Sequence, residues 1–172
     1  MADENKKGLY IQLYSLHGLI RGKELELGRD ADTGGQTKYV LELASMLSTF
    51  PEVEKVELVT RWIFDKKVSP DYSVPIEKVN DKFDIVRIRA GGGKYIRKEL
   101  LWNYLEEFSD KSIKYLKAKK RLPDFIHSHY ADAGYVCTEL TKFFGIPFFH
   151  SSHSLGKDKL KKLTEDGVSP EM

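Results

Sequence analysis

The chain has 172 residues, of which 41% are hydrophobic and 31% charged, and this is enough for one globular domain with a buried core. Its net charge of +2 does not indicate a broad basic surface for nucleic acid or a membrane. No apolar run approaches the roughly 18 residues of a membrane span. Cys137 is the only cysteine and residues 1–7 are polar, so we expect no intrachain disulfide, no signal peptide and a cytoplasmic location.

Short apolar segments alternate with helical ones along the chain. Residues 9–16 form the first predicted strand, and a helix follows at 34–49, with Tyr39, Val40, Leu43 and Leu47 on its inner face. Further strands are predicted at 53–61, 83–89, 125–129 and 146–151, and further helices at 98–120, 131–144 and 154–163.

This alternation predicts an α/β domain with a doubly wound parallel sheet, Rossmann-like, in which ligands bind beyond the carboxyl ends of the strands. Residues 62–81 are predicted to be a polar connector, and the alternating pattern of 83–89 is typical of a strand nearer an edge. Five predicted strands are fewer than the roughly six of a complete domain of this kind, so residues 1–172 are predicted to be a partial domain.

The loop after the first strand ends in a glycine pair at the start of the first helix. Gly34 and Gly35 would let the backbone approach a ligand closely, and the free N–H groups of the helix would then face an anion. Thr33 and Gln36 also fit a capping box, so a simple capped helix is the alternative.

Histidines and one aspartate follow the later strands. His127 and His129 are two residues apart on a predicted strand, so their side chains lie on one face, as in an H-x-H metal site. The candidates for completing such a site are His150, His153 and Asp132. The alternative is one packed imidazole and one polar site residue. Asp132, at the start of a helix, would either cap that helix or hold a sugar hydroxyl.

Basic residues occur near the same predicted edge. Lys98 follows a loop of three glycines at 91–93, and Lys157 and Lys159 follow a turn after His153. Each of these cations alone is compatible with a solvated surface, whereas together they would form a pocket suited to a phosphomonoester.

Several long segments resemble the amino-terminal half of sucrose-phosphate synthases, and together they cover nearly the whole chain. They are residues 15–22 (SLHGLIRG), 26–40 (ELGRDADTGGQTKYV), 94–102 (KYIRKELLW), 127–134 (HSHYADAG) and 153–159 (HSLGKDK). Sucrose synthases share DTGGQ but differ around residues 19–22 and lack the lysine-bearing segments.

The resemblance implies a retaining glycosyltransferase of the two-domain GT-B architecture, with residues 1–172 as part of the acceptor-binding domain. It would transfer glucose from UDP-glucose, or ADP-glucose in some relatives, to fructose 6-phosphate. The carboxyl-terminal nucleotide-sugar domain, with its Glu-x7-Glu motif, is not among these residues. The resemblance implies neither a metal nor another cofactor, and the isolated half is expected to be inactive.

Carried over by motif, the resemblance also implies residue roles. Gly34, Gly35 and Gln36 would contact the acceptor sugar and the donor diphosphate. Lys98 and Lys159 would bind the acceptor phosphate. His153 would contact the transferred glucose, and Asp132 with His129 would border the reacting centre. The alternatives are a non-catalytic sugar-phosphate-binding module, a sucrose synthase-like glucosyltransferase and a metal-dependent hydrolase.

Overall fold

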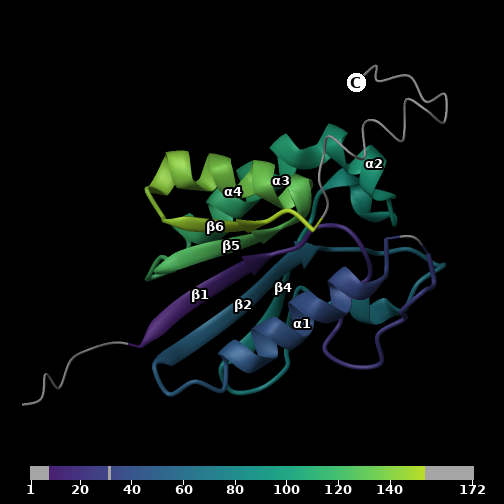
Figure 1. The fold of residues 1–172 in the computed structure, drawn as a ribbon. Coiled ribbons are helices and arrows are strands. Elements are labelled where there is room, and N and C mark those ends of the chain that lie inside the picture. Colours follow the sequence, from purple (N-terminus) through teal and green to yellow (C-terminus); the bar gives the residue numbers. More distant parts are fainter. Residues whose placement is uncertain (1–7, 31, 154–172) are drawn as a thin grey trace, which may run out of the picture.

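A six-stranded sheet forms the centre of the computed structural model, which describes residues 8–30 and 32–153 (Figure 1). The strand order is β3-β4-β2-β1-β5-β6, and every pairing among these strands is parallel except that of β3 with β4. The prediction of a doubly wound, predominantly parallel sheet is therefore confirmed. The strands are β1 (Leu9–Tyr14), β2 (Val53–Arg61), β3 (Ile76–Lys78), β4 (Phe83–Ile88), β5 (Phe125–His129) and β6 (Phe148–Ser151).

Helices cover both faces of the sheet. Helix α1 (Gly35–Leu47) lies on one face, whereas α3 (Leu105–Lys117) and α4 (Tyr130–Phe144) lie on the other (Figure 1). Alternate residues of β1 serve the two layers, since Leu13 packs in the cluster that contains Val40 of α1 and Tyr14 packs in the cluster that contains Val136 of α4.

Strand β3 lies inside the segment that we predicted to be a connector. It has three residues with exposed ends, and it adds an antiparallel edge beside β4. The prediction missed β3 because a short, polar edge strand carries no continuous apolar signal. Strand β4 is consequently the second strand from that edge, and it is buried over most of its length.

The helix predicted at 98–120 is broken. It consists of α2 (Lys98–Leu101), a 3₁₀ turn η3 (Trp102–Tyr104) and α3. Tyr104 leaves the helical backbone conformation at φ −122° and ψ 6°, and Glu106 and Glu107 occupy the first turn of α3, where carboxylates are favourable. Two further 3₁₀ turns are η1 (Pro70–Ser73) and η2 (Gly91–Gly93), and the helix predicted at 154–163 lies outside the described residues.

One of the four residues predicted for the inner face of α1, Tyr39, does not lie on it. Thr37, Val40 and Ala44 are its buried residues, whereas Tyr39 is 48% exposed. Residues 37, 40 and 44 follow the three- and four-residue spacing of one helical face, and Tyr39 lies outside that stripe. The Tyr39 ring is therefore free to contact residues at the carboxyl edge of the sheet.

A buried carboxylate lies between the sheet and α3. Glu57 of β2 is 3% exposed, and it accepts hydrogen bonds from Tyr10 Oη at 2.6 Å, Gln12 Nε2 at 2.8 Å, Tyr115 Oη at 3.0 Å and Lys119 Nζ at 2.7 Å. Burial by itself would raise the pKa of Glu57, but the hydrogen bonds and the lysine outweigh it and hold that pKa below its ordinary value. We call these five residues the Glu57 cluster.

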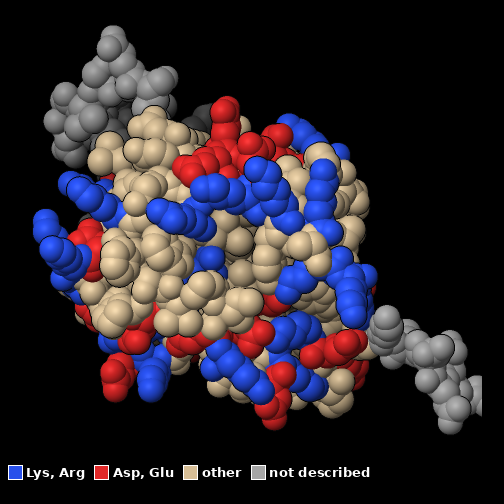
Figure 2. Space-filling view, turned by 180° about the vertical axis from the view of Figure 1, so that it is seen from behind, with Lys and Arg blue, Asp and Glu red and all other residues tan. Residues whose placement is uncertain are grey.

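The surface carries charges of both signs. On the face opposite to that of Figure 1, basic and acidic side chains are interspersed with uncharged ones (Figure 2). No helix in the described part of the chain is long and apolar enough to cross a membrane.

Candidate functional site

The carboxyl ends of β1, β5 and β6 meet the starts of α1 and α4 at one edge of the sheet. Gln36, in the first turn of α1, donates from Nε2 to Ser15 Oγ at 3.2 Å, just beyond β1. Further along α1, the Tyr39 ring lies 5.9 Å from the ring of His129 at the end of β5, and 5.4 Å from that of His153 after β6. The sequence-predicted residues of three separate segments therefore share this edge.

The fold does not require glycine at either position of the glycine pair at this edge. Gly34 has φ −123°, and neither Gly34 nor Gly35 has the positive φ that favours glycine over other residues. A methyl group added to either glycine would meet no atom within 4 Å. Gly18, in the same loop, is the opposite case, since it has φ +81° and an added methyl group would lie 2.6 Å from Asp32 O. The space beside Gly34 and Gly35 is consistent with a ligand that approaches the backbone.

The capping-box prediction for α1 is wrong. The N-cap residue is Gly34, and no side chain caps the helix. Thr33 Oγ1 instead accepts the N–H of Leu19 at 3.2 Å, which fixes the loop, while Gln36 reaches Ser15 rather than the cap. The first N–H groups of α1 are thus left without the side-chain acceptor that a capping box supplies.

Asp132 forms a buried pair with His17. The two residues are 1% and 4% exposed, and His17 Nδ1 lies 2.8 Å from Asp132 Oδ2. The other carboxylate oxygen accepts the N–H of Ala133 at 2.8 Å. The N-cap residue of α4 is His129 and no side chain caps this helix, so the alternative that Asp132 caps it is wrong. Sequence reasoning assigned no role to His17, which directly follows the first predicted strand.

Two histidines form a second pair. His129 is fully buried at the end of β5, and its Nδ1 lies 3.0 Å from His153 Nε2. Burial, and then the neighbouring His127 and His153, lower the pKa of His129 to about 3, and burial also lowers the pKa of His153. Both imidazoles are neutral at neutral pH.

The predicted common face of His127 and His129 is confirmed, since their ring centroids are 4.1 Å apart. His127 Nε2 is 2.9 Å from Ser151 Oγ, and His150 Nδ1 is 2.8 Å from Ser128 Oγ. These nitrogens contact hydroxyl groups rather than converging on one point. Within residues 8–30 and 32–153 no group of three or more histidines, cysteines and carboxylates has a metal-binding arrangement.

Lys98 is held at the edge by Asp32, which precedes the glycine pair. The Lys98 Nζ lies 2.9 Å from Asp32 Oδ1, and the backbone N–H of Lys98 donates to Oδ2 at 2.8 Å. Burial by itself would lower the pKa of Lys98, but the contact with Asp32 outweighs it and raises that pKa. An ammonium has three donors, so this contact leaves donors for a further anion. Lys157 and Lys159 lie outside the described residues.

Glycine occurs in the triple-glycine loop for a different reason than in the glycine pair. Gly91, Gly92 and Gly93 all have positive φ, between 68° and 88°. An added methyl group would lie 2.8 Å from the Trp62 ring at Gly93, and 2.8 Å from Ile96 at Gly91. The fold itself therefore requires glycine in this loop.

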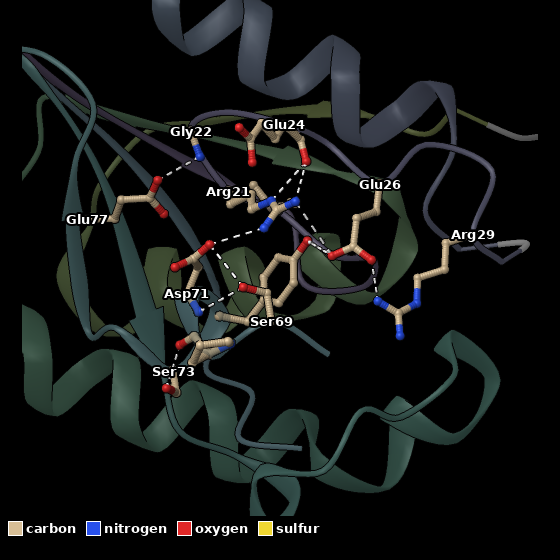
Figure 3. Close-up of polar contacts among 12 residues, drawn as sticks. Arg21, Gly22, Glu24, Glu26, Arg29, Ser69, Asp71, Ser73 and Glu77 are labelled. Atoms are coloured by element: carbon tan, nitrogen blue, oxygen red, sulfur yellow. Dashed lines mark hydrogen bonds and ion pairs between the residues drawn. The ribbon is translucent and has the colours of Figure 1, made fainter. Parts of the chain in front are cut away.

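The long loop between β1 and α1 is fixed by Arg21 (Figure 3). Its guanidinium donates twice to Glu24 O, at 2.9 and 2.6 Å, and pairs with Asp71 at 3.1 Å. Glu26 accepts from Tyr72 Oη at 2.9 Å, and the neighbouring Gly22 N–H donates to Glu77 at 2.8 Å. A cavity of about 380 Å³ lies beside this loop; it is lined by Arg21, Gly22, Lys23, Asp71, Val74, Glu77, Lys78 and Val79.

The fold and this edge define the class: an amino-terminal domain of the GT-B type, with its polar residues at the carboxyl ends of a parallel sheet. A family model described as the first GT-B domain of sucrose synthase matches residues 8–165, and the chain belongs to this family.

Similar proteins agree with this membership. The chain is 42% identical to a probable sucrose-phosphate synthase 1 of Oryza sativa subsp. japonica and to a sucrose-phosphate synthase of Zea mays, over 96% of its own length. The solved structure of a sucrose-phosphate synthase from Thermosynechococcus elongatus matches 95% of the chain with a TM-score of 0.76 and 26% identity. The chain spans 18% of the length of those plant proteins and 37% of that solved chain.

Proposed function

We propose that this chain is the acceptor-side domain of a retaining glucosyltransferase, which transfers glucose from UDP-glucose to the 2-hydroxyl of fructose 6-phosphate. The products are sucrose 6-phosphate and UDP. A second domain, not contained in these 172 residues, binds most of the nucleotide sugar and completes the enzyme. The compartment that we propose is the cytoplasm.

The observation that carries this proposal is the glycine pair. Gly34 and Gly35 lie where the backbone has no need of glycine, at a helix start whose N–H groups have no side-chain cap. Departure of a nucleoside diphosphate places negative charge on phosphate oxygens, and oriented N–H groups stabilise such charge. In this proposal Gly34, Gly35 and Gln36 contact the acceptor sugar and the diphosphate.

The phosphate of the acceptor is assigned to Lys98 and Lys159. Lys98 has an ammonium fixed by Asp32, with further donors for a phosphate oxygen. The same assignment distinguishes fructose 6-phosphate from fructose, because only the former carries the anion that a lysine binds.

The remaining residues lie around the reacting centre. His153 contacts the transferred glucose, and Asp132 and His129 border it. Since both oxygens of Asp132 have partners, we assign its action to the orientation of His17. Removal of the acceptor proton by the departing phosphate oxygen would make the transfer independent of a metal or other cofactor.

Calorimetric titration with fructose 6-phosphate and with fructose tests the proposal. Replacing Lys98 by Ala removes a charge-assisted contact worth roughly 1.5–3 kcal/mol, so affinity for fructose 6-phosphate should fall about 10- to 100-fold while that for fructose stays unchanged. Lys142→Ala is the matched control, because Lys142 pairs with Glu139 at 2.8 Å in the last turn of α4.

Three outcomes separate the alternatives. Equal affinity for the two sugars, unchanged in Lys98→Ala, would contradict the phosphate assignment and favour a sucrose synthase-like acceptor. Binding of fructose 6-phosphate without formation of sucrose 6-phosphate by the longer parent protein would indicate a non-catalytic module. Transfer by the longer protein, and none by these 172 residues alone, is the expected result.

A further inference from the structure

The rings of His129 and His153 are joined by one hydrogen bond, in which one ring donates and the other accepts. The Nδ1 of His129 and the Nε2 of His153 are 3.0 Å apart, and both rings are neutral at neutral pH. A neutral imidazole has one N–H, so one of these two nitrogens donates and the other accepts. The direction of this bond decides which nitrogen of His153 carries a proton.

The other nitrogen of His129 decides the direction. His129 Nε2 is buried and has no hydrogen-bond partner among the described residues. If Nδ1 were the acceptor, the proton of His129 would be on Nε2 as a buried N–H without an acceptor. Buried N–H groups of that kind are rarer than acceptors that lack a donor. The arrangement with the proton on Nδ1 of His129 is therefore favoured.

His153 is held in place for this contact. It has φ +55°, a backbone conformation that residues other than glycine adopt infrequently, and the Tyr39 ring packs edge-on against it. Such a conformation persists only where the surroundings enforce it, and it is concentrated at functional sites. Tyr39 also packs against His129, so one ring contacts both members of the pair.

We infer that His129 is a positioning residue that donates its Nδ1–H to His153 Nε2 and so fixes the proton of His153 on Nδ1. His153 then presents a neutral N–H donor, which suits a sugar hydroxyl or another oxygen acceptor. The inference rests on the proposed function only for the identity of that acceptor.

The tautomers can be observed directly in the 172-residue chain. In long-range ¹H–¹⁵N correlation spectra at neutral pH, Nε2 of both His129 and His153 should resonate as unprotonated nitrogen, and Nδ1 of both as protonated nitrogen. A protonated Nε2 on His153 would overturn the inference, and this result needs no variant.

Variants test whether His129 is the cause. In His129→Phe the donor is lost, and the Nε2 resonance of His153 should shift from the unprotonated to the protonated position. In His129→Asn the side-chain amide supplies a donor again, and the original position should return. His127→Phe is the matched control, because the His127 ring is adjacent but its Nε2 contacts Ser151. An unshifted His153 in His129→Phe would overturn the positioning role.

Addition of UDP-glucose to the longer protein, which also contains the proposed nucleotide-sugar domain, separates this inference from the proposed function. A change in the His153 resonances on addition supports a sugar contact. The expected tautomers without any change on addition would contradict the proposed role of His153, while the hydrogen bond from His129 would stand.

Discussion

The Glu57 cluster and the carboxyl edge of the sheet both bury polar side chains, but they satisfy them differently. Glu57 has four donors, two from strand β1 and two from the region of α3, all between 2.6 and 3.0 Å. At the edge, His129 Nε2 is buried without a partner among the described residues, and His153 has a positive φ.

This difference separates a stabilising network from a binding site. A buried polar network in which every group is paired makes the fold rigid and specific. Unpaired groups, strained backbone and unforced glycines each cost stability, and they persist where a ligand uses them. We therefore expect substitutions in the Glu57 cluster to change stability alone, and substitutions at the edge to change binding.

The largest expected effect is on stability, at Glu57. Glu57→Gln keeps the shape of the side chain but removes the negative charge to which Lys119 and the two tyrosines donate. The free energy of unfolding should therefore fall by about 3 kcal/mol. Affinity for fructose 6-phosphate should be unchanged. Urea unfolding and calorimetry measure the two quantities.

Asp84→Asn is the matched control for Glu57→Gln. Asp84 loses the same charge from a pair with Lys55 that is partly exposed, so the loss should stay below about 1 kcal/mol. Equal losses in the two variants would contradict the importance of the Glu57 cluster.

The second effect is a pH dependence that belongs to the edge. The pKa of His129 is about 3 in the folded chain and near 6.5 when unfolded, so below pH 6.5 the unfolded state binds a proton that the folded state does not. Between pH 6.5 and about 3, His129 should therefore lower stability by about 1.4 kcal/mol per pH unit, a contribution that His129→Phe should remove.

The Glu57 cluster should not respond between pH 6.5 and 4.5. The folded pKa of Glu57 lies below its ordinary value of 4.5, so its contribution is complete above that pH and is lost only as pH falls through the folded pKa. Unfolding by urea at several pH values checks both windows. If stability depended on pH identically in His129→Phe and in the original chain, the assignment of this pH dependence to His129 would be contradicted.

The smallest stability effect has the opposite sign. Gly35→Ala adds a methyl group into open space in the first turn of α1, so stability should rise by roughly 0.4–1 kcal/mol. Affinity for fructose 6-phosphate should fall, because the methyl group occupies the ligand's side of the helix start.

Gly18→Ala gives the contrast to Gly35→Ala. An added methyl group at Gly18 would lie 2.6 Å from Asp32 O, in a backbone conformation that favours glycine, so this variant should lose stability. Unchanged affinity in Gly35→Ala would remove the main support for a ligand at the glycine pair.

Local pattern predicted most of the architecture. The five longer strands and the helices that begin near residues 34 and 131 are confirmed, with bounds that shift by a few residues, whereas the helix predicted at 98–120 is broken. The failures have local causes as well. Strand β3 is too short and polar to be detected, and Tyr39 lies just outside the buried stripe of α1.

The sequence predicted which residues gather at the candidate site, but not which of them contact one another. Gly34, Gly35, Gln36, Asp132, His129 and His153 lie at the carboxyl ends of strands or at the helix starts that follow them, as a doubly wound sheet requires. The function of each of these residues stays a prediction. Thr33 and Gln36 show the limit of motif reasoning, since their spacing fits a capping box and both side chains bind elsewhere.

The sequence by itself determined the order of strands and helices and the edge at which the polar residues gather, because periodicity and turn residues act over a few neighbours. The tertiary structure alone decided the pairs: His17 with Asp132 across 115 positions, Lys98 with Asp32 across 66, and His129 with His153 across 24. A carboxylate or imidazole can be satisfied by many partners, and only the packed sheet selects which one comes within 3 Å.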